Sequence, residues 1–386
     1  MVSIYNNKQS SSFVRVWVLF SLMLAMASSF GLLLSVSVVL IYVQTASAAN
    51  CTVDQDDQSV FNMITKQEQE AIWIEGGFVR AGDQEWVSFA TILDTFVNAA
   101  VFVSLPEIPG ETSNEGYPAI ARIRNVVSTG QVSFDVRLYQ ANDTSCRKNW
   151  TIPVAIDPPV SLSWMAVERG AYNLSGAVFM IGDGEITRAI AAPYDPSNRH
   201  EFTFPPGCHA HDPTKPCEYN TGSDVGIIMQ LQTTVNERLL ISRVFSSNGI
   251  SLNNSVTLVL QTHDSPDRTY YEVANAEELA FMTYMNDLDI SCVERLSFET
   301  TKYDGVTHFK KEVTFVNTYT LPPGIYGTIA TARSLADSTG LRAFGRTVNS
   351  AKFITQEDQC FDEETQHTTG ELVRNGGYFL SCFCCF

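Results

Sequence analysis

Positive charge is scarce in this chain of 386 residues. Lysine and arginine number 25 against 42 aspartates and glutamates, which gives a formal net charge of −17. Nucleic-acid-binding proteins draw much of their affinity from lysine and arginine side chains that neutralise phosphates. So acidic a chain argues against DNA or RNA as a partner.

Catalytic signatures are missing as well. The sequence contains no G-x-S-x-G nucleophile elbow, no H-E-x-x-H zinc motif and no glycine-rich phosphate loop. Nor does a pair of carboxylates stand out as an acid and base. We therefore expect a protein that is not an enzyme and that uses no cofactor or metal.

Long apolar runs are confined to the N-terminus. Residues 16–43 are predominantly apolar, follow Lys8 and Arg15, and precede the small residues 46–48 (Ala-Ser-Ala). This order is typical of a secretory signal peptide, although the run is also long enough to span a bilayer as a signal-anchor. Under both alternatives residues 50 onward face the exterior, so we expect a secreted protein or one tethered to the membrane by its N-terminal segment.

Glycosylation signals and cysteines fit an exported chain. The five Asn-x-Ser/Thr sites are at Asn50, Asn142, Asn149, Asn173 and Asn253. Among nine cysteines, Cys208 and Cys217 bracket a polar loop with two histidines, which suggests either a zinc site or a short-range disulfide. The order of these residues differs from the usual paired zinc spacings, so the sequence favours a disulfide.

Helical periodicity is rare, and short alternating segments rich in Val, Ile, Thr, Phe and Tyr dominate. Residues 131–139 are the clearest case, and residues 255–262 are their counterpart later in the chain. Such alternation predicts strands with one face in a core and the other in water. We expect an all-β protein.

One pattern occurs three times at domain spacing. A strand ending in Phe lies at residues 87–89, 202–204 and 313–315, and an apolar-small-Arg step ends at Arg122, Arg243 and Arg346. A closing strand contains Trp164 in the first copy and Phe281 in the second, while the third copy has no convincing closing strand. The predicted organisation is a leader (1–49), a lead-in (50–75), two domains (76–170 and 171–300), and a partial or truncated third (301–386).

The first copy resembles the H-type lectin domain family, that of snail agglutinin. The resemblance rests on residues 87–89 (VSF), 101–105 (VFVSL), 120–122 (IAR), 130–134 and 162–166 (LSWMA). It implies tandem six-stranded antiparallel β-sandwiches that trimerise and bind galactose or N-acetylgalactosamine without a metal. In that family an acidic loop residue, an arginine and a Trp-His pair hold the sugar.

Carried over to this sequence, the resemblance gives candidate carbohydrate-binding residues in each copy. They are Asp83 in the first copy, Arg238, His263 and Asp264 in the second, and Asp304, Arg342 and His367 in the third. The first copy has Pro118 in place of the arginine and residues 139–142 (Tyr-Gln-Ala-Asn) in place of the Trp-His pair.

Two functions follow from these features. The first is an extracellular lectin that binds glycans or glycoproteins in adhesion or recognition, as a homotrimer by resemblance. The alternative is a structural or matrix glycoprotein that uses lectin-like sandwiches as assembly modules without binding sugar. For single residues the alternatives are ion pairing by Arg122, Arg243 and Arg346, core packing by Trp164 and Phe281, and a simple turn role for Asp83.

Overall fold

The chain divides into two units, Met1–Ala48 and Ala49–Phe386. The computed structural model describes part of the second unit. The described residues are 74–107, 119–140, 159–174, 177–189, 200–203, 225–235, 240–244, 255–261, 271–285, 288–290, 294–298, 301–315, 322–329, 339–357, 371–378 and 381–382. This part is all-β, contains no helix, and consists of small antiparallel sheets, as the sequence predicted.

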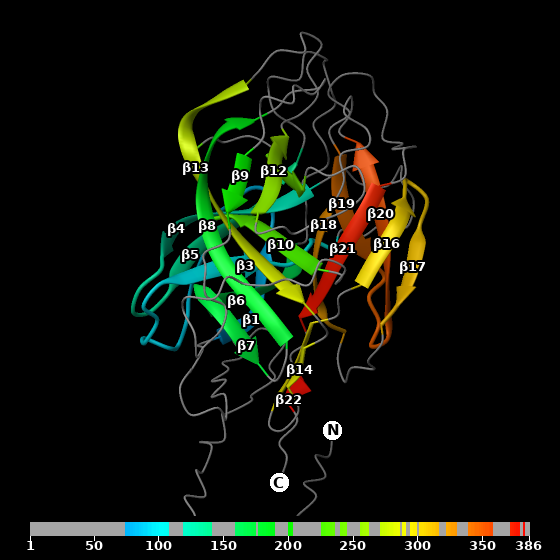
Figure 1. Cartoon of the computed structure of the whole chain (residues 1–386), viewed down its shortest axis with the longest axis horizontal. Helices are drawn as coiled ribbons and strands as arrows, with labels where there is room; N and C mark the ends of the chain where they lie inside the picture. Colours follow the sequence, from blue (N-terminus) through cyan, green and yellow to red (C-terminus); the bar gives the residue numbers. More distant parts are fainter. Residues whose placement is uncertain are drawn as a thin grey trace, which may run out of the picture. The chain divides into compact units, whose positions relative to one another are not determined.

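The first copy has two three-stranded sheets (Figure 1). One has the order β1-β6-β3 and the other β2-β5-β4. Their bounds are β1 (Ile74–Ala81), β2 (Val87–Ala90), β3 (Ala99–Val103), β4 (Ala119–Val127), β5 (Ser133–Gln140) and β6 (Val160–Glu168).

The second copy repeats this order with one strand added. Its sheets are β10-β13-β8-β7 and β11-β12-β9, in which β8, β13 and β10 correspond to β1, β6 and β3. The strands are β7 (Gly170–Leu174), β8 (Ala177–Ala189), β9 (His200–Thr203), β10 (Val225–Leu231), β11 (Ile241–Val244), β12 (Ser255–Gln261) and β13 (Tyr271–Met285). The extra strand, β7, pairs with β8 at the edge of its sheet.

The third copy also has six strands, where the sequence analysis expected a partial unit. Its sheets, β16-β21-β18 and β17-β20-β19, repeat the order of the first copy. The strands are β16 (Thr301–Val306), β17 (Lys311–Thr314), β18 (Gly324–Ile329), β19 (Thr339–Phe344), β20 (Ser350–Glu357) and β21 (Glu371–Tyr378). The closing strand β21 pairs with strands on both sides. A further small sheet combines β14 (Leu288–Ile290), β15 (Glu294–Phe298) and β22 (Ser381–Cys382).

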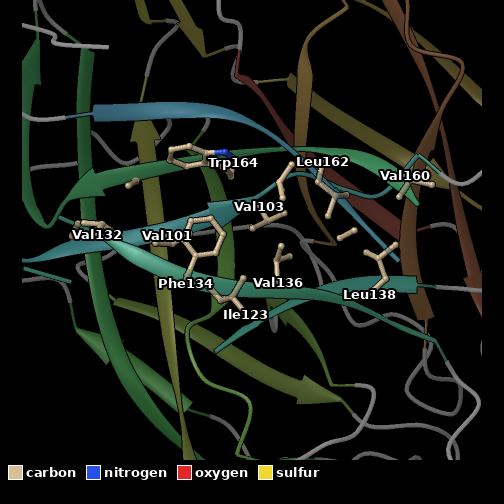
Figure 2. Close-up of a cluster of buried hydrophobic side chains, with 14 of the residues drawn as sticks. Val101, Val103, Ile123, Val132, Phe134, Val136, Leu138, Val160, Leu162 and Trp164 are labelled. Atoms are coloured by element: carbon tan, nitrogen blue, oxygen red, sulfur yellow. The ribbon is translucent and has the colours of Figure 1, made fainter. Parts of the chain in front are cut away.

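The core of the first copy lies between its two sheets. Figure 2 shows Trp164 and Leu162 of β6 opposite Phe134 and Val136 of β5, all at most 1 % exposed. Alternation explains this, because every second residue of β5 points inward while its neighbours point away. The third copy has a comparable core, with members from β16 to β20.

Two backbone positions shape the sheet β2-β5-β4. Gly130 has φ 69° in the turn before β5, a conformation that glycine adopts without strain. Asn125 has φ 53° at a register shift in β4, and its Nδ2 donates to Asp135 Oδ2 at 2.8 Å. Asparagine tolerates this left-handed conformation better than most residues, so it fits a bulge here.

Candidate functional site

Three arginines occupy the same strand position in the three copies. They are Arg122 on β4, Arg243 on β11 and Arg342 on β19, which are 1 %, 1 % and 0 % exposed. Burial lowers the pKa of Arg342 to about 10. It also lowers the pKa of Arg122, against the effect of Glu277. A guanidinium is costly to bury, so its recurrence at one position points to a shared structural role.

The residue that meets each arginine is also equivalent. Arg243 faces Val259, and its Nη1 donates to Gln261, two residues further along β12, at 2.9 Å. Arg342 faces Ile354, and its Nη1 donates to Gln356, again two residues further on, at 2.7 Å.

In the first copy Arg122 faces Arg137, and the residue two positions on is Tyr139. The guanidinium carbon of Arg122 lies 5.7 Å from the centre of the Tyr139 ring. An aromatic ring thus replaces the amide of the other two copies.

This register corrects the assignment of two arginines. The sequence analysis placed Arg346 with Arg122 and Arg243 and placed Arg342 in a sugar site, but Arg342 is the equivalent residue and is fully buried. Arg346 lies beyond the end of β19, and its Nε donates to Glu107 of the first copy at 2.6 Å. Arg346 therefore joins the third copy to the first.

A buried ion pair joins the first two copies. Nη2 of Arg122 lies 3.1 Å from Oε1 of Glu277 on β13, which is 0 % exposed, and also donates to the Thr233 carbonyl at 3.0 Å. Oε2 of Glu277 accepts hydrogen bonds from the Thr233 hydroxyl at 2.6 Å and from the Val235 backbone at 3.3 Å. The carboxylate is thus held by groups from both copies.

Glutamine side chains of the second copy cover the edge strand β3. Oε1 of Gln232 accepts from the Val101 backbone N–H at 3.0 Å, and its Nε2 donates to the Val101 carbonyl at 2.7 Å. Gln230 accepts from the Val103 backbone at 3.4 Å and donates to the Ala121 carbonyl at 3.1 Å. The side chains replace a neighbouring strand, so this edge cannot pair with another molecule.

Equivalent strands of all three copies meet around a cavity of about 80 Å³. Its lining includes Ser104, Gln230 and Thr328, which follow or lie on β3, β10 and β18. Sites for small organic ligands are about 300–1,000 Å³, so this volume suits a few water molecules better than a sugar. All three copies therefore contribute residues to one small cavity.

A cluster of aromatic and guanidinium groups lies on the outer face of the sheet β2-β5-β4. The rings of Trp86 and Tyr139 are 6.0 Å apart. The guanidinium carbon of Arg124 is 4.1 Å from the centre of the Trp86 ring, and that of Arg137 is 4.8 Å from Trp86 and 4.4 Å from Tyr139. Tyr139 also packs against Ile241 of the second copy, so the cluster borders the junction between copies.

The loop that contains Asp83 runs beside this cluster. The carbonyl of Gly82 accepts from the Leu138 backbone N–H at 2.9 Å, which holds the loop against β5 one residue before Tyr139. Oδ1 of Asp83 accepts from Gln84 Nε2 at 3.0 Å. Asp83 thus directly follows the residue that is hydrogen-bonded to β5.

Asp135 neutralises one arginine of the cluster. Its Oδ2 accepts from Arg124 Nε at 3.2 Å, and its Oδ1 accepts from the Ser88 hydroxyl at 2.7 Å. Desolvation raises the pKa of Asp135, but the hydrogen bonds from Ser88, Asn125 and Arg124 together outweigh it and lower the pKa. Asp135 therefore stays a carboxylate.

The remaining predicted residues are placed as follows. Trp164 and Phe281 are buried, at 0 % and 2 % exposed. Asp304 lies in β16 beside a register shift, and Asn173 lies in β7. The other predicted positions lie outside the described residues: Arg238, His263, Asp264, His367, Cys208, Cys217, Asn50, Asn142, Asn149 and Asn253.

Sequence reasoning did not single out five residues that the structure places at these contacts: Trp86, Arg137, Gln230, Gln232 and Glu277. The alternation of β5 contained a signal for Arg137, because Asp135, Arg137 and Tyr139 are the outward positions of that strand. No comparable signal exists for Glu277, since its partner is 155 residues away in the sequence.

Comparisons with known protein families, with curated proteins and with solved structures found no match. The described residues contain no cluster of three or more histidine, cysteine or acidic side chains that could hold a metal ion. In the same part of the chain, no helix has the length and apolar character needed to cross a membrane.

Proposed function

We propose that this chain is an exported glycan-binding protein made of three tandem H-type lectin-like β-sandwiches, and that it acts in adhesion or recognition. The threefold strand order supports the proposal, since a six-stranded pair of antiparallel sheets is what the family resemblance implies. The equivalent buried arginines support the tandem repeat at the level of single residues, but they do not bear on sugar binding.

The observation that carries glycan binding is the aromatic and guanidinium cluster beside the Asp83 loop. Sugars are recognised by ring stacking on their apolar face and by charged side chains on their hydroxyl groups. Trp86 supplies a partly exposed ring, Arg137 and Asp83 supply the two charges, and the buried Tyr139 holds Arg137. The first copy thus has these chemical groups although it lacks the Trp-His pair of the family.

We further propose that the trimer expected from the resemblance forms within one chain. The copies are joined by Arg122 with Glu277, by Arg346 with Glu107, and by a backbone hydrogen bond from Leu105 to Ile325 at 2.8 Å. Surfaces that would join separate subunits are then internal. Residues 49–386 should sediment as a monomer, whereas a trimer of chains would contradict this assembly.

A glycan array followed by titration calorimetry on residues 49–386 tests the function. We expect galactose-containing glycans to bind and Trp86→Ala to weaken binding by at least about tenfold, since truncation of a tryptophan that anchors a ligand typically costs about 2 kcal/mol or more. Phe309→Ala is the matched control, because Phe309 is an aromatic residue that is 71 % exposed on the third copy. Absence of binding to every glycan at millimolar concentration would refute the proposal.

The second candidate function is a matrix or assembly module without sugar binding. Its supporting observation is Arg342, which the resemblance places in a sugar site but which is completely buried against Gln356. Under this alternative, Trp86→Ala changes no glycan interaction, while Arg122→Met still disturbs the joint between the first two copies.

A further inference from the structure

The outer face of the sheet β2-β5-β4 gathers three arginines on a chain in which acidic residues outnumber basic ones, 42 to 25. Arg122 is paired with Glu277, and Arg124 with Asp135. Among the described residues, no carboxylate lies within ion-pair distance of Arg137. One of the three guanidinium charges is therefore not neutralised by this part of the chain.

Aromatic groups hold Arg137 in place of a carboxylate. Its guanidinium carbon is 4.8 Å from the Trp86 ring centre and 4.4 Å from that of Tyr139, and Nη2 donates to the Tyr139 hydroxyl. Stacking of this kind restricts the guanidinium and desolvates it in part. A cation whose orientation is already restricted pays less entropy when it binds a ligand.

The chemistry that fits such a group is an oxyanion. A guanidinium presents planar pairs of N–H donors that match the two oxygens of a carboxylate or sulfate, and charge-assisted bonds of this kind are about twice as strong as neutral ones. The hydroxyl of Tyr139 accepts from Arg137, which fixes the plane of the guanidinium. Trp86 supplies an apolar surface next to the anion position.

We propose that the site on the first copy binds acidic glycans, with the carboxylate or sulfate of the sugar on Arg137 and the sugar ring against Trp86. This inference rests on the proposed function, because it names the ligand class of the same site. The high negative charge of the chain repels anions at long range. Recognition therefore depends on the short-range contacts of this cluster, and neutral galactosides bind more weakly.

The test compares three ligands on residues 49–386 by titration calorimetry: galactose, galactose 6-sulfate and galacturonic acid. We expect at least one acidic sugar to bind about tenfold or more tightly than galactose. The sulfate and carboxylate arms show which anion fits. Equal affinity for all three would overturn the inference but leave the proposed glycan binding intact, whereas binding of none would refute the proposed function itself.

Variants locate the anion. Arg137→Gln should reduce the affinity for the acidic sugar to that for galactose, and Arg137→Lys should restore only part of it because an ammonium lacks the paired donors. The control is Arg80→Gln, which makes the same charge change at an exposed position on β1 and should leave the preference unchanged. An acidic-sugar preference that survives Arg137→Gln in a folded variant would place the anion elsewhere and overturn the inference.

Should Arg137→Gln fail to fold, a salt titration of the unmodified protein takes its place. Affinity for the acidic sugar should fall as sodium chloride rises from 0.05 to 0.5 M, since screening weakens a charge-assisted contact at a half-exposed site. Affinity for galactose should stay constant over the same range. Identical salt dependence of the two ligands would overturn the inference.

Discussion

The buried pair of Arg122 and Glu277 provides the sharpest test of how the copies are joined. Arg122→Met removes the cation but leaves a carboxylate that is 0 % exposed. Breaking one partner of a buried ion pair costs about 3–5 kcal/mol, because the remaining charge stays in a low-dielectric environment. We expect Glu277→Leu to cost a similar amount, since it leaves the Arg122 guanidinium without its carboxylate.

The double variant Arg122→Met with Glu277→Leu should be far less destabilised than the sum of the two single variants. No uncompensated charge remains in it, and replacing a buried pair with apolar side chains is often close to neutral. The Thr233 hydroxyl and the Val235 N–H lose their acceptor, which costs about 1–3 kcal/mol. A positive coupling of at least about 2 kcal/mol should therefore appear between the two sites.

Denaturant unfolding of residues 49–386 measures all four proteins of this cycle. The control is Arg124→Met, which breaks the pair with Asp135 at a site where the arginine side chain is 35 % exposed and the aspartate 15 %. This pair is partly exposed, and Asp135 keeps its hydrogen bonds from Ser88 and Asn125, so the variant should cost clearly less than Arg122→Met or Glu277→Leu. Single variants whose costs simply add in the double variant would refute the buried pair as a joint between copies.

Three further predictions concern packing, pH and the contact between the third and first copies. Gly182→Ala should lower stability by about 1–3 kcal/mol in thermal melts, because a Cβ there would lie 2.5 Å from Cζ of Phe281. The lowered pKa of Asp135 contributes stability above the ordinary aspartate value of about 4, which is lost as pH falls through the folded value. Asp135→Asn should therefore flatten the acid limb of the stability curve. Glu107→Gln should cost about 1–2 kcal/mol in denaturant melts by removing the carboxylate that holds Arg346, and no change would show that this contact is not needed for stability.

The strands of the first copy could be predicted from sequence because their faces differ chemically. The segment 131–139 alternates strictly, and the structure has β5 from Ser133 to Gln140. Its counterpart at 255–262 is β12 (Ser255–Gln261). In such strands the hydrophobic face alone sets the orientation of every side chain, so local pattern is sufficient.

The closing strand of the third copy was missed for a physical reason. Strand β21 contains two consecutive glycines, Gly376 and Gly377, and few residues that favour strands. Its stability comes from hydrogen-bonded neighbours on both sides, β16 and β18, which are distant in sequence. A central strand can therefore form without the local signal on which the sequence analysis relied.

The third arginine was misassigned because a motif does not show register. Residues 344–346 match the apolar-small-Arg pattern of the other two copies. The strand pairing nevertheless identifies Arg342 as the equivalent arginine, because it faces Ile354 and bonds Gln356, two residues further on. The candidate site shows the same limit. Asp83 was predicted from the resemblance, but Trp86 and Arg137 become neighbours only through the strand order β2-β5-β4.

Because the three copies are joined in one chain, equivalent positions can contain different residue types. Tyr139 of the first copy is an example. In the second and third copies the equivalent residues, Gln261 and Gln356, bond a buried arginine and serve the interior. Tyr139 contacts Arg122 on one side and Arg137 on the other, so it belongs both to the joint between copies and to the outer cluster. A homotrimer of identical subunits would repeat one side chain at all three positions. Because the copies here are independent in sequence, one of them can place an aromatic ring at the joint between copies while the other two keep the amide.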